Sequence, residues 1–211
     1  MAGVDGYRGG WVVVTIDEAG AVSVHACHTF AEVVELDLAV IAVDIPIGIP
    51  DDKARPADTE ARRFVGRRAS SVFSTPTRAA LEAPTFADAV ARAREVTGKG
   101  ISRQAFALRG RILEVDAMAH ADKRLIEVHP EVSFREVAGR PLEYSKHTVE
   151  GLLERRALLA EAGLEVPAAR EVPEADLLDA AAAAWTAGRY RRGEARPLPK
   201  GHGERIGAIW R

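Results

Sequence analysis

Cysteine, long apolar runs and an excess of either charge are all scarce in this sequence of 211 residues. The single cysteine, Cys27, excludes an intrachain disulfide framework and is typical of a reducing compartment. No apolar run approaches the ~20 residues that cross a bilayer, and the first residues lack the basic region and apolar stretch of a signal peptide. With 31 acidic and 29 basic residues the net charge is −2, so a polyanion would have to bind a local basic patch. We therefore expect a cytoplasmic protein that has no membrane partner.

The apolar content is high, at 47%, and no low-complexity tract interrupts it. A chain of this length builds one sizeable core, or one core with an inserted subdomain. We predict a single domain over residues 1–211.

An acidic residue followed by a glycine-rich turn stands near the start of the chain. Asp5 ends a short apolar run, Gly6, Gly9 and Gly10 follow, and a second apolar run begins at Trp11. This pattern predicts a strand, a tight turn and an antiparallel partner strand. An acid at the end of such a strand either hydrogen-bonds the turn backbone or holds a metal ion. The hairpin alone leaves both interpretations open.

Further strands are predicted at 21–27, 38–45 and 124–129. The segment 38–45 is almost continuously apolar and reaches an acid at Asp44, which is typical of a strand buried on both faces. A capping box predicts a crossover helix over 29–36, and this helix would allow the fourth strand to pack beside the first. The order of elements predicts an α/β fold with a mixed sheet: three antiparallel strands, then parallel ones.

Residues 51–122 are rich in charge and in helical spacing, and we interpret them as a helical insertion or cap after the fourth strand. Within it we expect helices at 60–65, at 85–97 and from Ser102 through a stripe of apolar residues ending at Ala119. Later helices are predicted at 131–138, 148–163 and 176–190, and one short edge strand is predicted near 206–210.

The last long helix carries two acids on one face. Asp176 and Asp179 are three residues apart, and the alanines that follow would let the helix approach a sheet closely. Acids in a first turn also interact favourably with the helix dipole, which is a sufficient reason for Asp176 alone. Together with Asp5 and Asp44 they form an all-oxygen set of the kind that Mg²⁺ or Mn²⁺ prefers.

Five motifs in this order resemble one known family; they are Gly3-Val4-Asp5-Gly6-Tyr7-Arg8-Gly9-Gly10-Trp11, Val43-Asp44-Ile45-Pro46-Ile47-Gly48-Ile49-Pro50, Ser71-Val72-Phe73 with Pro76-Thr77-Arg78, Glu127-Val128-His129-Pro130-Glu131-Val132-Ser133-Phe134, and Asp176-Leu177-Leu178-Asp179-Ala180 with Ala184-Trp185-Thr186-Ala187. The family is domain of unknown function family 429, a group of predicted RNase H-like nucleases. The first strand and the last helix also resemble RuvC-type resolvases. The resemblance implies a ribonuclease H-like sheet that brings Asp5 and Asp44 together, facing Asp179. The chain departs from the family at Arg55-Pro56-Ala57-Asp58, where a cysteine often precedes the aspartate.

The acids and the resemblance together predict a metal-dependent nuclease that hydrolyses phosphodiester bonds by a two-metal mechanism. Asp5, Asp44 and Asp179 would hold Mg²⁺ or Mn²⁺, and Asp176 would assist. A nucleotide-binding phosphotransferase or ATPase of the same superfamily and a non-catalytic nucleic-acid-binding module remain as alternatives. The choice between DNA and RNA, and whether the chain forms a homodimer, stay open.

Several other residues are candidates for the site, but each can also be explained by a purely structural role. Glu127 and His129 share a strand face and are either accessory site residues or a buried hydrogen-bonded pair. Lys146 would contact a phosphate, although a solvated lysine is the simpler expectation. A cluster of arginines would bind nucleic-acid phosphates or form a solvated face; its members are Arg62, Arg63, Arg67 and Arg68. Trp185 and Tyr190 would stack on bases only if they were not part of the core.

Overall fold

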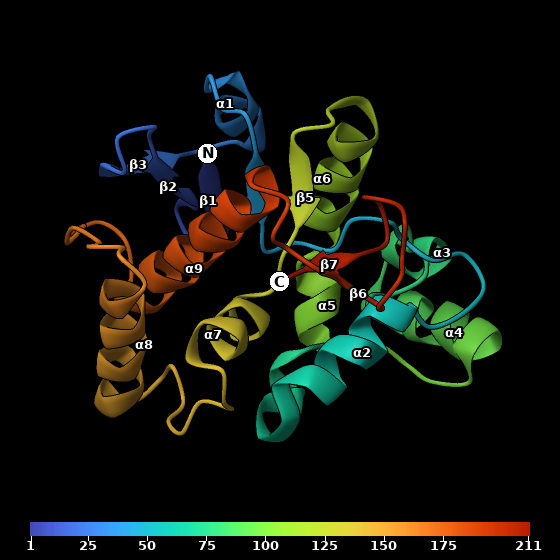
Figure 1. Cartoon of the computed structure of the whole chain (residues 1–211). Coiled ribbons are helices and arrows are strands. Elements are labelled where there is room, and N and C mark those ends of the chain that lie inside the picture. The colour runs from blue at the N-terminus through green and yellow to red at the C-terminus, as the bar shows by residue number, and fades with distance from the viewer.

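The N-terminal hairpin forms the antiparallel half of a five-stranded sheet in the computed structural model, which describes all residues 1–211 (Figure 1). β1 (Ala2–Tyr7) pairs with β2 (Gly10–Ile16), and β2 pairs with β3 (Val22–Cys27), both antiparallel. β4 (Ile41–Val43) and β5 (Leu125–Glu127) add the parallel half, in the order β3-β2-β1-β4-β5. The predicted mixed α/β sheet, with the fourth strand beside the first, is confirmed.

The two parallel strands are shorter than predicted. The predicted strand 38–45 pairs only over 41–43, and the predicted strand 124–129 only over 125–127. Each segment runs into a proline, Pro46 or Pro130, which has no N–H to donate to a ladder. The chain therefore leaves the sheet at Asp44 and at Val128.

One helix covers the face of the sheet that carries the odd-numbered residues of β1. α9 (Glu174–Arg191) packs against β1, β2 and β4, and its alanines from Ala180 to Ala184 are fully buried. A Cβ on Gly3 would lie only 2.0 Å from the Ala184 nitrogen, so glycine is required for this contact. The close approach places the start of α9 beside the end of β1.

The other face is covered by α1 (Phe30–Glu35), which connects β3 to β4 as predicted, and by α6 (Arg109–Ala121). The chain between β4 and β5 is mainly helical; it contains α2 (Pro56–Val65), a 3-10 helix at Gly66–Ser71 (η1), α3 (Arg78–Leu81), α4 (Phe86–Thr97), α5 (Arg103–Ala107) and α6. Its interpretation as an insertion within one domain stays a prediction.

Two helix boundaries in this segment were predicted wrongly. α2 begins at Pro56, not near residue 60, because proline is favourable in a first helical turn. The helix predicted from Ser102 is broken at Leu108, which ends α5 and begins α6, so that the stripe containing Ile112 and Val115 faces the sheet.

The chain after β5 supplies α7 (Pro130–Ala138) and α8 (Val149–Glu161) before α9, close to their predicted positions. The predicted edge strand 206–210 is reduced to β7 (Ile209–Trp210). β7 pairs with β6 (Pro197–Leu198) in a separate two-stranded sheet, and a single bridge joins Trp210 to Val128. No helix combines the length and the apolar character that a membrane span requires.

Candidate functional site

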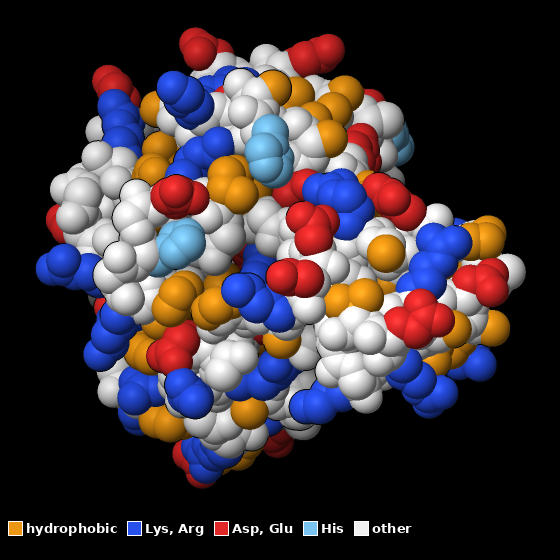
Figure 2. Space-filling model, turned by 90° about the vertical axis from the view of Figure 1, so that its right-hand side faces the viewer, with side chains coloured by type: hydrophobic (Ala, Val, Ile, Leu, Met, Phe, Trp, Pro, Cys, Tyr) orange, Lys and Arg blue, Asp and Glu red, His pale blue; other side chains and the backbone are white.

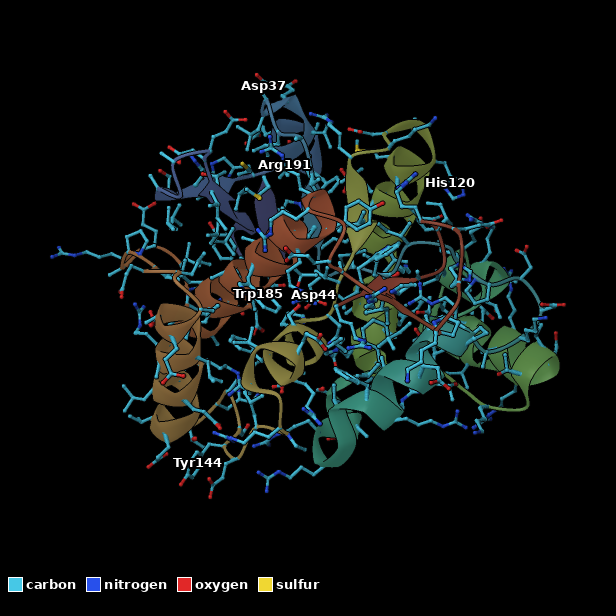
Figure 3. The ribbon with its side chains drawn as sticks, in the orientation of Figure 1. Asp37, Asp44, His120, Tyr144, Trp185 and Arg191 are labelled. Atoms are coloured by element: carbon cyan, nitrogen blue, oxygen red, sulfur yellow. The ribbon has the colours of Figure 1, made fainter.

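The four predicted aspartates line a single cleft at one end of the sheet. Asp5 lies at the end of β1, Asp44 follows β4 directly, and Asp176 and Asp179 lie in the first turns of α9. The cleft has a volume of about 530 Å³ and is also lined by Lys146. In Figure 3 Asp44 lies in the middle of the molecule, close to α9, whereas Tyr144 lies at its periphery.

Sheet geometry explains why Asp5 and Asp44 face α9. Side chains alternate along a strand, and Ala2 and Val4 of β1 pack into the core on the α6 side. Gly3 and Asp5 therefore point to the α9 side. Likewise Ala42 packs with the alanines of α9, so Asp44, two residues later, points the same way. The parallel pairing of Val4 with Val43 then places the two acids side by side.

Burial and mutual repulsion make these carboxylates reluctant to ionise. Asp5 is 8% exposed and Asp179 is 2% exposed. Burial, and then the charges of Asp44 and Asp179, raise the pKa of Asp5 well above its ordinary value. Burial raises the pKa of Asp179 to about 6, although Lys146 opposes the shift. Burial also raises the pKa values of Asp44 and Asp176. A cation placed among these groups would relieve both the burial cost and the repulsion.

The hydrogen bonds of the four acids leave much of their capacity unused. One oxygen of Asp5 accepts the backbone N–H of Gly6 at 2.7 Å, so Asp5 does fix the turn, as one of the two interpretations proposed. The carboxylates of Asp44 and Asp176 take part in no hydrogen bond or ion pair within the chain, and both residues line the cleft.

Lys146 is not the solvated lysine that was the simpler expectation. Its Nζ lies 2.5 Å from Oδ2 of Asp179, and its side chain is only 31% exposed. Burial opposes the charged form of Lys146, but the attraction of Asp179, and then of Asp44 and Asp5, outweighs burial and raises the pKa. Lys146 is therefore the cation of the acidic cluster in this structure.

The carboxylates are not arranged as a finished coordination shell. No group of three or more His, Cys, Asp or Glu side chains is close enough together to hold a metal ion, and the metal site formed by Asp5, Asp44 and Asp179 stays a prediction. Asp179 pairs with Lys146 instead. The donor set nevertheless fits a hard divalent cation, since it consists of carboxylates with unused oxygens.

Glu127 lies in the wall of the same cleft but faces away from α9. Leu125 packs on the α6 side, so Glu127, two residues later, points there too. Arg55 binds both of its oxygens, at 2.5 and 2.6 Å, and the Ile47 N–H donates to it at 2.6 Å. Arg55 also donates to Asp58, which accepts the Thr75 N–H. Burial raises the pKa of Glu127 to about 7 despite Arg55. This network holds the segment after β4 and hence the position of Asp44.

His129 caps α7 through a hydrogen bond from the Glu131 N–H to its Nδ1 and lines the cleft. The predicted phosphate-binding arginines mostly make contacts within the chain. Arg62 donates to the Val72 carbonyl, Arg67 to that of Leu142 and Arg68 to that of Glu143. Arg63 pairs with Glu60. Of these four arginines only Arg68 lines the cleft.

The two aromatic candidates lie outside the cleft. Arg189 stacks on Trp185, and Tyr190 makes an edge-on contact with Trp210. Both residues are half-buried, and each ring already makes one such contact within the chain.

Several residues of the site were missed by sequence reasoning. Arg111, on α6, lines the cleft, stacks on Trp11 and donates to the Tyr7 carbonyl at 2.7 Å, which holds the turn after Asp5. The sequence marks Arg55 as part of a charged segment and, with Asp58, as a departure from a family pattern, but it does not indicate that the two residues bind each other. Glu131 and Arg155 form a buried ion pair beside the cleft. One sequence feature could have indicated these residues: an arginine within an apolar helical segment must find a buried partner when the helix packs.

Comparison with known proteins gives one match. A family model described as a protein of unknown function, DUF429, matches residues 3–204. No curated protein and no solved structure matches the chain.

Proposed function

The chain belongs to the DUF429 family, whose function is unknown, and we propose from its site that it is a metal-dependent nuclease, a hydrolase of phosphodiester bonds. The observation that carries the proposal is the convergence of carboxylates from β1, from the end of β4 and from α9 on one cleft. Such a set is costly to bury without a cation, as the raised pKa of Asp5 indicates.

Asp5, Asp44 and Asp179 would hold Mg²⁺ or Mn²⁺, and Asp176, at the more exposed end of the cluster, would orient water. Divalent ions bound there would lower the pKa of the attacking water and neutralise charge on the phosphate and on the leaving oxygen. The chain's own part is to fix the carboxylates on rigid elements, Asp5 through the Gly6 N–H and the α9 acids through the buried alanines.

The rest of the cleft supports a polyanionic substrate. Basic and imidazole side chains line the cleft together with the acids; they include Arg68, Arg111, His129, Lys146 and His147. Ser70 and Ser71 also line the cleft. We propose nucleic acid as the substrate, and the sheet order, with three antiparallel strands followed by two parallel ones, supports an RNase H-like fold.

The test is cleavage of end-labelled oligonucleotides, with single-stranded DNA, duplex DNA, RNA and a four-way junction assayed in parallel. Mn²⁺ or Mg²⁺ is expected to support cleavage of at least one substrate, and EDTA is expected to stop it. Asp5→Asn and Asp179→Asn should each lower the rate by 10²-fold or more, on the order of the loss when one transition-state contact is removed.

Arg63→Gln is the matched control, because Arg63 is exposed and does not line the cleft. It should cleave like the native protein. Cleavage that survives Asp5→Asn, or that is indifferent to EDTA, would show that the acidic cleft is not the active site.

A further inference from the structure

Lys146 is the cation that pairs with the acidic cluster. Its Nζ contacts Asp179 at 2.5 Å, and the charges of Asp44 and Asp5 act on it as well. A divalent ion shared by Asp5, Asp44 and Asp179 would bind the same Asp179 carboxylate and would be repelled by the ammonium group of Lys146. The Asp179 carboxylate therefore faces two competing cations.

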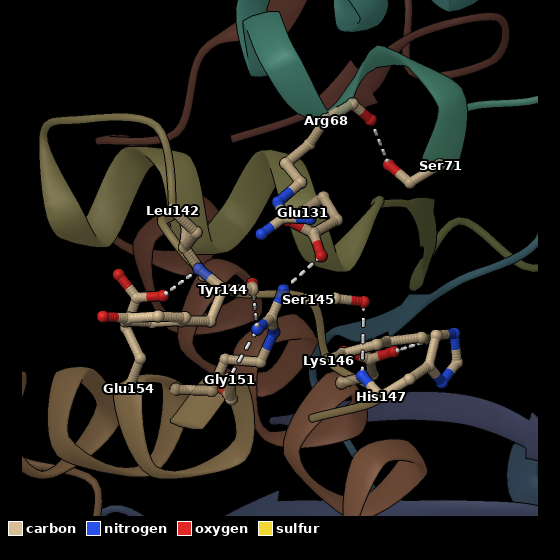
Figure 4. Close-up of polar contacts among 12 residues, drawn as sticks. Arg68, Ser71, Glu131, Leu142, Tyr144, Ser145, Lys146, His147, Gly151 and Glu154 are labelled. Carbon is tan, nitrogen blue, oxygen red and sulfur yellow. Dashed lines mark hydrogen bonds and ion pairs between the residues drawn. The ribbon is translucent and has the colours of Figure 1, made fainter. Parts of the chain in front are cut away.

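The loop that carries Lys146 is fixed at several points on its approach to the cleft (Figure 4). The Glu154 carboxylate accepts the backbone N–H groups of Glu143 and Tyr144. From the other side Arg67 and Arg68 donate to the carbonyls of Leu142 and Glu143, at 2.9 and 2.7 Å. These bonds join the loop both to α8 and to η1.

The two residues that precede Lys146, Tyr144 and Ser145, are also fixed by contacts with α8. Arg155, which is fully buried, donates to the Tyr144 carbonyl at 3.3 Å and pairs with Glu131. A Cβ at Gly151 would lie 1.8 Å from the Ser145 carbonyl oxygen, so the loop rests directly on α8. The backbone of Lys146 is thus positioned by its neighbours, and only the flexible side chain is left to move.

We propose that Lys146 is a built-in counter-ion that closes the metal site in the metal-free protein and is displaced from Asp179 when a divalent ion binds. This inference rests on the proposed function, because it assumes that the acidic cluster binds metal. The ammonium group lowers the repulsion among the carboxylates without a metal, and metal binding then has to break the Lys146–Asp179 pair. Binding of the metal and pairing of the lysine are therefore antagonistic.

Calorimetric titration of Mn²⁺ alone into Lys146→Met at pH 8 tests the competition. The variant should bind Mn²⁺ about tenfold more tightly than the native protein, within the usual range for two coupled ligands. The melting temperature of the same variant in EDTA should fall, because the carboxylates lose their counter-ion. Lys146→Arg, which keeps the charge, should bind Mn²⁺ with close to native affinity.

Lys99→Met controls for the loss of one positive charge, since Lys99 is exposed and lies outside the cleft; it should leave both measurements unchanged. If Lys146→Met does not fold, Lys146→Gln serves instead, because its amide still donates to Asp179. Native or weaker Mn²⁺ affinity in the neutral variant, with the native protein binding Mn²⁺, overturns the counter-ion proposal alone. If neither protein binds Mn²⁺, the proposed metal-dependent function fails, and the counter-ion proposal fails with it.

Discussion

At the scale of single residues, Asp5 combines two roles that are separable by one substitution. Its carboxylate fixes the turn through the Gly6 N–H, and it contributes negative charge to a crowded cluster. Asparagine keeps an oxygen that accepts the Gly6 N–H and removes the charge. The substitution therefore distinguishes a turn residue from a metal ligand.

We predict that Asp5→Asn leaves the metal-free protein as stable as the native one or more stable, because repulsion from Asp44 and Asp179 is lost. A gain of about 1 kcal/mol would raise the melting temperature by roughly 2–4 °C in a chain of this size. Mn²⁺ should raise the melting temperature of the native protein by mass action and that of the variant much less. Thermal melts with EDTA and with Mn²⁺ measure both effects.

The opposite result would be a variant that melts at a lower temperature than the native protein in both conditions, with Mn²⁺ raising the melting temperature of the two proteins equally. That result would mean that Asp5 only fixes the turn.

Because these pKa values are raised, the stability difference between Asp5→Asn and the native protein should depend on pH, and the sign of that dependence can be derived. A carboxyl group whose pKa is higher in the folded than in the unfolded protein stabilises the fold below its unfolded pKa and loses that contribution as the pH rises through the folded pKa. For Asp179 the window runs from its ordinary value of 3.8 to about 6. For Asp5 the loss likewise begins at 3.8 and continues to a pKa that burial and the charges of Asp44 and Asp179 raise well above that value.

The stability advantage of Asp5→Asn over the native protein should therefore be small near pH 4.5 and larger at pH 7.5, in EDTA. Mn²⁺ affinity of the native protein should rise over the same interval, because the metal binds deprotonated carboxylates. Urea unfolding and calorimetric titration at three pH values measure these two trends. Lys99→Met, which alters a distant charge, should follow the native protein. A stability difference that stays constant with pH would contradict the raised pKa of the cluster.

At the scale of the elements, the site depends on the contact between β1 and α9. Gly3 and Asp5 lie on the same face of β1, and α9 carries Asp179 just before the alanines that pack over Gly3. A Cβ at Gly3 would meet the backbone of Ala180 and Ala184 at 2.1 and 2.0 Å, and backbone atoms give way only if the whole helix shifts. Helix packing and the separation of the acids are therefore coupled.

We predict that Gly3→Ala lowers the free energy of unfolding by roughly 1–3 kcal/mol, as expected for overpacking, and also weakens Mn²⁺ binding. Gly110→Ala is the matched control: Gly110 lies in α6, and no atom lies within 4 Å of the added Cβ. It should be neutral or slightly stabilising, because alanine favours a helix. Urea unfolding and Mn²⁺ titration of both variants measure the effects. Loss of stability with unchanged metal affinity would show that α9 does not set the geometry of the site.

The same elements show what the sequence predicts well. The hairpin, the strand ending at Asp44 and the acid-bearing helix all have strong local patterns, namely alternation, a continuous apolar run and an i, i+3 pair before alanines. The face on which each acid lies follows from those patterns, and the family resemblance implied that Asp5, Asp44 and Asp179 would meet, as they do at one cleft. Boundaries were not, because the break at Leu108 depends on packing against the sheet.

Contacts between segments that are far apart in the chain could not be predicted from the sequence. The partners Lys146 and Asp179 are 33 residues apart, and Arg55 and Glu127 are 72 residues apart. Nothing local to Lys146 distinguishes it from a solvated lysine; its position follows from Arg155, Glu154 and Gly151, which fix its loop from α8. Arginines that were predicted as a phosphate-binding surface are used in part to fix the same loop.

At the scale of the whole molecule, charge is mixed over the surface. Figure 2 shows acidic and basic side chains interspersed on one face, as a net charge of −2 suggests. A nucleic acid would thus be attracted only locally, by the basic groups that line the cleft together with the acids. Arg68 is the one member of the predicted arginine cluster among them.

Two neighbouring arginines allow this local attraction to be measured. Arg67 and Arg68 both donate to a carbonyl of the loop that precedes Lys146, but only Arg68 lines the cleft. We predict that Arg68→Gln weakens oligonucleotide binding and reduces the slope of log K against log salt by about one, as expected for the loss of one phosphate contact. Fluorescence anisotropy between 50 and 200 mM salt, with Ca²⁺ as the divalent ion, measures both quantities.

The control is Arg67→Gln, which also removes one hydrogen bond to the loop and should leave the slope unchanged. Equal slopes in the native protein and both variants would mean that Arg68 serves only to hold the loop, and that the phosphates of the substrate are bound elsewhere on the cleft wall.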